Sequence, residues 1–355
     1  MGEGYASTSE LAKERFGLMN NNQWTTANTR SPASPTQEPL RGQTPAGRPA
    51  QTFRWQLAEG ATVGLALVAA TQRLTSNGVE SPKLDSEVLM AHLLSCTRAQ
   101  IYAHPERLLT EDERKSYERL VIRRCQDEPV AYLIGEKAFY GLDLMVDQRV
   151  LIPRPETELL VDMVLDVALQ YDTPSSHERN GSQLEPRRFL VADIGTGSGA
   201  VAVAVIANSA SAFVFAVDIS PDALNVARAN AQRHGQEQRI QFLQGDLLEP
   251  LPQAVDLIAA NLPYVAANEW SRLALDIVNY EPAQALLGGA DGLDFIRRLL
   301  QQAPERLLPG GVLLLEVGAS QGGAVAEMAR RSFPDAMIEV LTDYAFRERI
   351  VRIQT

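Results

Sequence analysis

The stretch FLVADIGTGSG, residues 189–199, gives the clearest indication of the fold that we predict for this chain. Its apolar run is typical of a buried strand and ends at Asp193, glycines follow at every second position, and the apolar segment Ala200–Ala207 predicts a helix. Glycines let the backbone turn tightly and let a ligand approach where a Cβ atom would clash. The spacing is neither that of a dinucleotide fingerprint nor that of a P-loop, which disfavours nucleoside triphosphates. The predicted ligand-binding residues of this turn are Gly195, Thr196, Gly197, Ser198 and Gly199, and a tight turn without a ligand is the alternative.

Short apolar strands alternate with helical segments from this turn onward. The alternation predicts an α/β fold with a mostly parallel, seven-stranded sheet flanked by helices. Ligands of such sheets lie beyond the carboxyl ends of the strands, where the strand order reverses. The predicted strands are Phe189–Asp193, Phe213–Asp218, Ile240–Gly245, Asp256–Asn261, Val312–Val317, Ala336–Leu341 and Ile350–Gln354.

The chain before the sheet divides into three predicted parts. Residues 1–54 are rich in Pro and Asn and lack apolar periodicity, which predicts a disordered tail. Residues 55–133 show helical spacing and predict a small N-terminal helical domain. Residues 134–155 contain short apolar runs split by polar residues and predict a β-hairpin linker, so that residues 156–355 form the α/β domain.

Local signals refine these parts. In the helical domain, Leu65, Leu74, Leu84 and Leu89 are among the predicted apolar positions, and helix starts are predicted at Ser81-Pro82 and Thr110-Glu111. In the α/β domain, a helix is predicted over Glu156–Gln170 and an exposed loop over Asp172–Arg188.

Composition excludes several classes of protein. No apolar run of this 355-residue chain approaches the ~20 residues that cross a bilayer, and no secretory signal is present, so we expect a cytoplasmic protein without membrane contact. Cys96 and Cys125 form no Cys-x-x-Cys pair, which argues against a disulfide scaffold. No two histidines have the spacing of metal ligands, and we expect no metal.

The charge balance disfavours nucleic acid. Lys and Arg total 33 against 44 Asp and Glu, a net charge of -11. Residues 1–54 hold six basic and four acidic side chains, so residues 55–355 carry about -13. Broad phosphate contact therefore has the wrong electrostatics, and direct binding of nucleic acid is not expected.

Acidic residues end the second and third predicted strands of the sheet. Asp218 lies some 20 residues after the glycines, the spacing at which a carboxylate accepts both ribose hydroxyls of an adenosine. Asp246 would accept from an adenine amino group while Leu247 covers a face of the ring. The alternatives are that Asp218 only opens the next helix, a role that Ser220 can fill, and that Asp246 and Leu247 are a solvated turn residue and a core residue.

Together the three strand ends predict a pocket for an adenosine joined to a group without a phosphate, because the glycine turn holds no Lys or Arg. S-adenosyl-L-methionine has this chemistry, and the prediction is therefore a methyl donor.

The fourth strand end, Asn261-Leu262-Pro263-Tyr264, predicts what is methylated. A planar conjugated nitrogen attacks only if its lone pair is turned out of conjugation and aimed at the methyl group. The side-chain Oδ1 of Asn261 and the backbone carbonyl of Leu262 can each accept one N–H of an NH2 group and hold it so, while Pro263 shapes the turn and Tyr264 stacks on the flat acceptor. We therefore predict that all four bind substrate and act in catalysis and that Asn261 also borders the cofactor; an ordinary turn is the alternative.

These residues resemble the release-factor glutamine methyltransferase family, a branch of the Rossmann-like class I S-adenosyl-L-methionine-dependent methyltransferases, over roughly residues 60–355. The segments that carry the resemblance are EPVAYLIG (128–135), FYG (139–141), VLIPRPETE (150–158), DIGTGSG (193–199), NLPY (261–264) and RER (347–349). The resemblance implies that the helical domain recognises a class-one peptide-chain release factor and that the enzyme methylates N5 of the glutamine in its Gly-Gly-Gln motif. Leu262 stands where the family has proline, and because the backbone carbonyl is kept we expect activity to survive.

Other functions remain open at this point. A DNA adenine-N6 methyltransferase has a similar acceptor loop, but the acidic charge disfavours DNA. A sibling family acts on a ribosomal protein and has Pro-Arg-Ser-Pro where this chain has Pro153-Arg154-Pro155-Glu156, which favours the release-factor branch. A non-enzymatic sensor of S-adenosyl-L-methionine would not need the acceptor loop. We expect a monomer and assign no roles to Arg154, Glu156 or Glu158.

Overall fold

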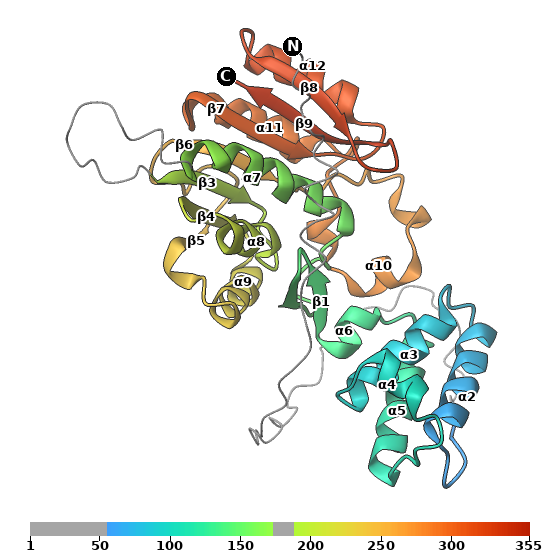
Figure 1. Ribbon diagram of the computed structural model, residues 1–355. Helices are drawn as coiled ribbons and strands as arrows, with labels where there is room; N and C mark the ends of the chain where they lie inside the picture. Colours follow the sequence, from blue (N-terminus) through green and yellow to red (C-terminus); the bar gives the residue numbers. More distant parts are fainter. Residues whose placement is uncertain (1–54, 173–187) are drawn as a thin grey trace, which may run out of the picture. The chain divides into compact units, whose positions relative to one another are not determined.

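The computed structural model describes residues 55–172 and 188–355 (Figure 1). The predicted tail over residues 1–54 and nearly all of the predicted loop over residues 172–188 lie outside these described residues.

The first described part is helical, as predicted. It contains α2 (Val63–Ser76), α3 (Pro82–Leu93), α4 (Arg98–Ala103), α5 (Glu111–Arg124) and α6 (Val130–Ile134). Both predicted helix starts are confirmed, because α3 begins at Pro82 and the side chain of Thr110 accepts from the backbone N–H of Glu113 in a capping box at the start of α5.

Two of the predicted apolar positions, Leu65 and Leu84, do not face the core. Leu65 is 64% exposed because Ala66, Ala70 and Leu74, spaced four residues apart, turn the opposite face of α2 inward. Leu84 is exposed because α3 turns a different face toward the core. That buried face includes two carboxylates with cationic partners, Asp85 with Arg124 at 2.7 Å and Glu87 with Arg98.

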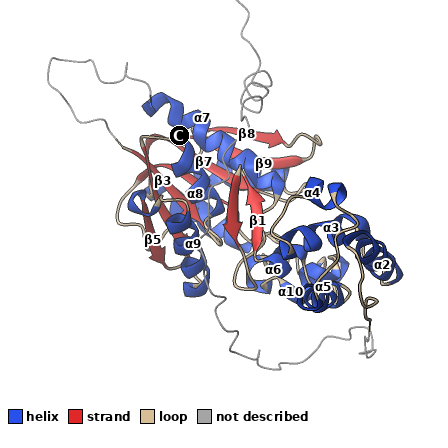
Figure 2. Ribbon diagram, turned by 60° about the horizontal axis from the view of Figure 1, so that its bottom comes forward, coloured by secondary structure: helices blue, strands red, loops and turns tan. Residues whose placement is uncertain are grey.

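A hairpin follows α6 directly (Figure 2). Its antiparallel strands are β1 (Glu136–Phe139) and β2 (Leu142–Met145), and the turn residues Tyr140 and Gly141 both have positive φ, as a tight two-residue hairpin turn requires. Residues 150–152, which were predicted to belong to the hairpin, form no strand.

The rest of the chain forms the predicted seven-stranded sheet, with strand order β5-β4-β3-β6-β7-β9-β8. The first five strands are parallel and β9 is antiparallel to both neighbours, so the sheet is mostly parallel, and the order reverses between β3 and β6. The strands are β3 (Phe189–Ile194), β4 (Ala212–Asp218), β5 (Ile240–Gln244), β6 (Val255–Ala260), β7 (Leu307–Glu316), β8 (Met337–Thr342) and β9 (Glu348–Gln354).

Helices cover both faces of this sheet (Figure 1). Alternate strand residues point to opposite faces: Val191 and Val214 pack with α7 and α8, whereas Ala192 and Phe215 pack with α11 and α12. The helices are α7 (Glu158–Asp172), α8 (Ala200–Asn208), α9 (Pro221–Arg233), α10 (Leu275–Tyr280), α11 (Asp294–Gln302) and α12 (Gly322–Ser332), with 3-10 turns η1 (Pro155–Thr157), η3 (Glu237–Arg239), η4 (Trp270–Arg272), η5 (Ala283–Ala285) and η6 (Ala303–Glu305).

A buried carboxylate joins two distant segments. Glu281, which follows α10, accepts a hydrogen bond at Oε2 from the backbone N–H of Ile152 at 3.0 Å and forms an ion pair at Oε1 with Arg154 at 2.5 Å. Its side chain is 1% exposed, so both partners are needed to compensate the loss of water. Arg154 therefore has a structural contact here, in the segment that leads from the hairpin into η1.

Candidate active site

The pairing of β3 with β6 places the glycine turn beside the predicted acceptor motif, Asn261-Leu262-Pro263-Tyr264. Ile194 is the register partner of Ala260, so Gly195 and Asn261 follow on adjacent strands. A Cβ atom on Gly195 would lie 3.3 Å from the backbone oxygen of Asn261 and 3.3 Å from Cδ2 of Leu262, and the φ of Gly195 is +74°. Only glycine meets both conditions without strain, which lets the two loops touch.

A buried carboxylate holds the glycine turn in place through hydrogen bonds. Asp193 accepts hydrogen bonds from the Thr196 hydroxyl at 2.6 Å and from the backbone N–H of Ala202 at 3.2 Å. Burial raises the pKa of Asp193 to about 6. The sequence placed Asp193 at a strand end but gave no sign that it holds the turn.

Asp218 lies at the tip of β4 with its carboxylate turned toward the glycine turn. It accepts from the backbone N–H of Gly197 at Oδ2 and of Ser220 at Oδ1, both at 2.9 Å, and burial raises its pKa. A carboxylate offers about four lone-pair sites, so acceptor capacity remains for a ligand. Ser220 caps α9 by accepting from Ala223 at 3.2 Å, which shows that the helix start does not need Asp218.

Sequence reasoning passed over Ile219, the next residue. Its side chain is 63% exposed although both β4 before it and α9 after it are anchored in the core. An apolar side chain beside Asp218 offers a surface for a flat ring, and the signal in the sequence was its place between a strand end and a helix cap.

The third strand end differs from the first two. Asp246 forms an ion pair with Arg298 of α11, and Leu247, with φ +50°, is 6% exposed and packs in the core cluster on the α11 side. The predicted contacts of Asp246 and Leu247 with an adenine therefore compete with partners inside the protein.

In the acceptor motif, the side-chain amide of Asn261 is held by a neighbour. Its Nδ2 donates to the hydroxyl of Thr157 at 3.1 Å, which leaves Oδ1 on the opposite side of the amide group. Leu262 is 5% exposed, and burial raises the pKa of Tyr264, whose backbone oxygen accepts from Nε2 of Gln321 at 3.0 Å. The motif is thus fixed at its side chains and its backbone.

Known proteins match the chain over this same arrangement. Residues 66–135 match the family model of the PrmC N-terminal domain, and residues 189–315 match that of a methyltransferase domain. The release factor glutamine methyltransferase of Koribacter versatilis is 39% identical over 76% of this chain and 91% of its own length. The one of Moorella thermoacetica is 40% identical over 81% of this chain and 96% of its own length. The chain belongs to the release factor glutamine methyltransferase family.

As a member of the release factor glutamine methyltransferase family the chain is a methyltransferase. The family and the fold class that the sequence predicted are both confirmed. Residues 55–172 and 188–355 contain no group of three or more His, Cys, Asp or Glu side chains that could hold a metal ion. Within the same residues no helix is long and apolar enough to cross a membrane.

Two further glycines, which sequence reasoning missed, admit the backbone of the predicted acceptor motif. A Cβ atom on Gly288 would lie 2.4 Å from the backbone oxygen of Pro263, and one on Gly292 would lie 2.2 Å from that of Tyr264. Both distances are far below van der Waals contact, so each glycine admits the backbone of the motif.

Replacing Gly292 with alanine is expected to displace Tyr264 and to lower methyl transfer by roughly 10- to 100-fold, because misplacement by about 1 Å can cost two orders of magnitude. Gly310→Ala is the matched control, since Gly310 has a similar φ of +78° but nothing within 4 Å of a Cβ atom. The measurement is the initial rate of methyl transfer together with the melting temperature of both variants. Equal rates in the two variants would contradict the role of Gly292.

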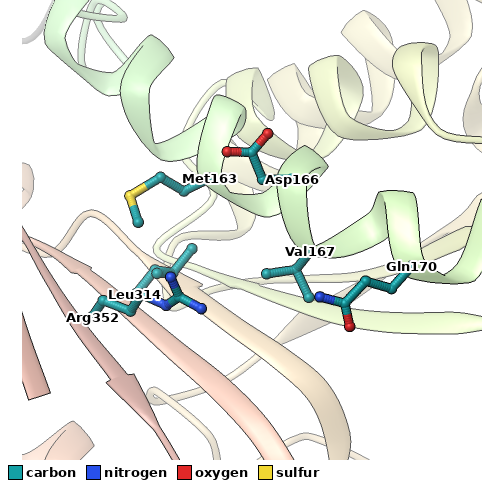
Figure 3. A pocket seen from close by; sticks show the side chains of 6 residues that line it. All are labelled: Met163, Asp166, Val167, Gln170, Leu314 and Arg352. Atoms are coloured by element: carbon teal, nitrogen blue, oxygen red, sulfur yellow. The ribbon is translucent and has the colours of Figure 1, made fainter. Parts of the chain in front are cut away.

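Two hollows of the described surface differ in their distance from the candidate site. One of about 220 Å³ lies between α7 and the strands β7 and β9, and Figure 3 shows Met163, Asp166, Val167 and Gln170 of the helix facing Leu314 and Arg352. It contains none of the predicted site residues. A larger one of about 690 Å³ is lined by residues around Leu287 and by α11, including the Arg298 that pairs with Asp246. Only the second borders the loops of the candidate site.

Proposed function

We propose that this enzyme transfers the methyl group of S-adenosyl-L-methionine to the side-chain amide nitrogen, N5, of the glutamine in the Gly-Gly-Gln motif of class-one peptide-chain release factors. The observation that carries the proposal is the contact between the glycine turn at Gly195 and the acceptor motif at Asn261, with the amide of Asn261 oriented by Thr157. The names of the curated relatives support the same substrate class.

The residues at the strand ends suit the cofactor. The turn over Gly195, Thr196, Gly197, Ser198 and Gly199 brings backbone rather than side chains to its surface, and a Cβ atom on Gly199 would lie 3.1 Å from Ala227 of α9. Asp218 retains acceptor capacity for two ribose hydroxyls, and Ile219 presents an apolar surface for the adenine. S-adenosyl-L-methionine, when bound, supplies a methyl group already activated by a positive sulfonium.

Because the methyl group is activated, the protein has mainly to position the acceptor. Oδ1 of Asn261 and the backbone carbonyl of Leu262 accept the two N–H groups of the glutamine amide, and the ring of Tyr264 packs on its plane. Leu262 keeps the carbonyl that this role needs although it replaces the usual proline. The nitrogen gains the methyl carbon, the sulfur keeps the electron pair of the broken bond, and the surplus proton leaves to water.

The decisive experiment incubates the full chain with labelled S-adenosyl-L-methionine and a class-one release factor. We expect label on the release factor and none when the glutamine of its Gly-Gly-Gln motif is replaced. Label that persists in that variant would contradict the proposal. A ribosomal protein and adenine-containing DNA serve as competing substrates, and preferential labelling of either would replace the proposed function with the corresponding alternative.

The helical part is the proposed recognition domain for the protein substrate. On α2, Leu65 and Val68 lie three residues apart on one face and are 64% and 57% exposed. Exposed apolar side chains grouped in this way suit contact with another protein.

Replacing Leu65 and Val68 together with serine is expected to raise the KM for the release factor roughly tenfold, which corresponds to about 1.4 kcal/mol of lost contact. The affinity for S-adenosyl-L-methionine, measured by calorimetry, should not change. Leu169→Ser, at an equally exposed leucine of α7, is the control. A KM that stays at the wild-type value would remove this face of α2 from the recognition surface.

A further inference from the structure

The amide orientation of Asn261 depends on a residue of a different element. Thr157 belongs to η1, 104 positions before Asn261 in the sequence, and its hydroxyl accepts from Nδ2 at 3.1 Å. Thr157 is 5% exposed, so water does not compete for this hydrogen bond. A hydroxyl has one proton and two lone pairs, and the bond from Asn261 leaves the proton of Thr157 free for another acceptor.

The carboxyl group of Glu316 is the candidate for that acceptor. Glu316 ends β7, and because Ala260 pairs with Leu315 in the sheet, Glu316 lies beside Asn261 on the adjacent strand. An interaction with Thr157 lowers the pKa of its carboxyl group, against the effect of burial. An ionised carboxylate only accepts, so a hydrogen bond from Thr157 to Glu316 would keep a lone pair of the hydroxyl pointed at the NH2 group of Asn261.

Burial of Glu316 is costly and is not explained by packing. Its side chain is 1% exposed, and Oε2 makes no hydrogen bond. The charged and titratable groups that face it are Arg349 of β9, Glu156 of η1 and Tyr264. Burial raises the pKa of Glu316 to about 7 even though Thr157 and Arg349 act in the opposite direction. A buried polar group with an unused oxygen indicates a role beyond stability.

We propose that Thr157 and Glu316 are positioning residues that fix the amide of Asn261 with its Oδ1 toward the acceptor glutamine. The inference rests on the proposed function, since it assigns these two residues to the same methyl transfer. If the amide turned over, Oδ1 would meet a hydroxyl oxygen whose proton is held by Glu316, and two lone pairs would face each other. The pair therefore selects one of the two amide orientations.

The test uses the full chain, labelled S-adenosyl-L-methionine and a release factor, with three variants. Thr157→Val keeps the shape but removes the hydroxyl, and we expect kcat to fall roughly 10- to 100-fold while KM for the release factor changes by less than about threefold. Thr157→Ser keeps the hydroxyl and should restore most of kcat. Calorimetry should find the same affinity for S-adenosyl-L-methionine in all of them.

Glu316→Gln tests whether the negative charge of the Glu316 carboxylate is needed to orient Thr157. In the wild-type chain kcat should rise as the pH passes upward through about 7, where Glu316 becomes an obligate acceptor. The glutamine variant offers an uncharged acceptor oxygen at every pH, so this rise should be absent. Its melting temperature at pH 8 should be at or above that of the wild type, because a buried charge has been removed.

The results separate the two proposals. A wild-type chain that labels no release factor counts against the proposed function and the inference together. A labelled release factor with unchanged kcat in Thr157→Val, or with no rescue by Thr157→Ser, overturns the inference alone. A pH rise that persists in Glu316→Gln also overturns it.

Discussion

Replacing Asn261 with alanine should lower methyl transfer by at least about 10²- to 10³-fold, the loss seen when one preorganised hydrogen-bonding group is removed from an active site. The physical reason is that in the proposed mechanism Oδ1 of Asn261 is the acceptor that turns the glutamine nitrogen toward the methyl group, and the alanine side chain has no polar atom. S-adenosyl-L-methionine binding, measured by calorimetry, should be nearly unchanged, because the glycine turn and Asp218 remain.

The matched control for this variant is Asn225→Ala, at an exposed asparagine of α9 that lies outside the acceptor motif. It should retain the wild-type rate. Equal turnover by Asn261→Ala and the wild-type chain would exclude the positioning mechanism, whereas loss of both turnover and cofactor affinity would indicate that the strand end has collapsed.

The second large effect is expected at Asp218. Its replacement by alanine should weaken binding of S-adenosyl-L-methionine by about 1.5–3 kcal/mol, or roughly 10- to 150-fold in Kd, if charge-assisted hydrogen bonds to the ribose are lost. Asp218→Asn keeps one oxygen for the backbone N–H of Gly197 and should give an intermediate loss. Calorimetric titration with S-adenosyl-L-methionine measures the Kd of both variants. Asp222→Ala is the control, because Asp222 is an exposed carboxylate in the first turn of α9.

The same carboxylate gives the pH dependence of binding a direction. Burial raises the pKa of Asp218, so on acidification it takes up a proton at a higher pH than an exposed aspartate does. Affinity for S-adenosyl-L-methionine should therefore be full above this pKa and fall below it, and Asp218→Asn should remove the dependence. Unchanged affinity in Asp218→Ala would take this residue out of the cofactor site.

The sheet was predictable because buried parallel strands are continuous apolar runs bounded by turn signals. All seven strands form, with ends shifted by at most two residues except at β7, which starts at Leu307 rather than Val312. That extension contains Pro309, Gly310 and Gly311, residues that local preference keeps out of strands but that the pairing with β6 accommodates through an irregular register. The exposure of Leu65 was not predictable, because the choice between two faces of α2 depends on tertiary contacts.

The residues of the candidate site also fall into a predictable and an unpredictable group. Residues that end consecutive strands are visible in a sequence because each follows a recognisable apolar run, and this was enough to predict Asp218 and Asn261 as site residues. Thr157, Glu316, Gly288 and Gly292 act through residues far away in the chain, and no local pattern reports such a contact. The prediction for Asp246 fails to account for a distant partner. Its carboxylate looks available for a ligand in the sequence, but it pairs with Arg298, 52 positions later.

The contact of Glu281 with Ile152 and Arg154 has a consequence for how the protein is made. It joins residues 129 and 127 positions apart, so during synthesis Ile152 and Arg154 lack this partner until the residue after α10 has been translated. At about 5–20 residues per second this delay lasts roughly 6 to 26 seconds, long enough for the local helices α2 to α5 to form first. The helical part should thus be protected from proteolysis on nascent chains that still end before Glu281, whereas the segment around Arg154 should become resistant only on longer ones.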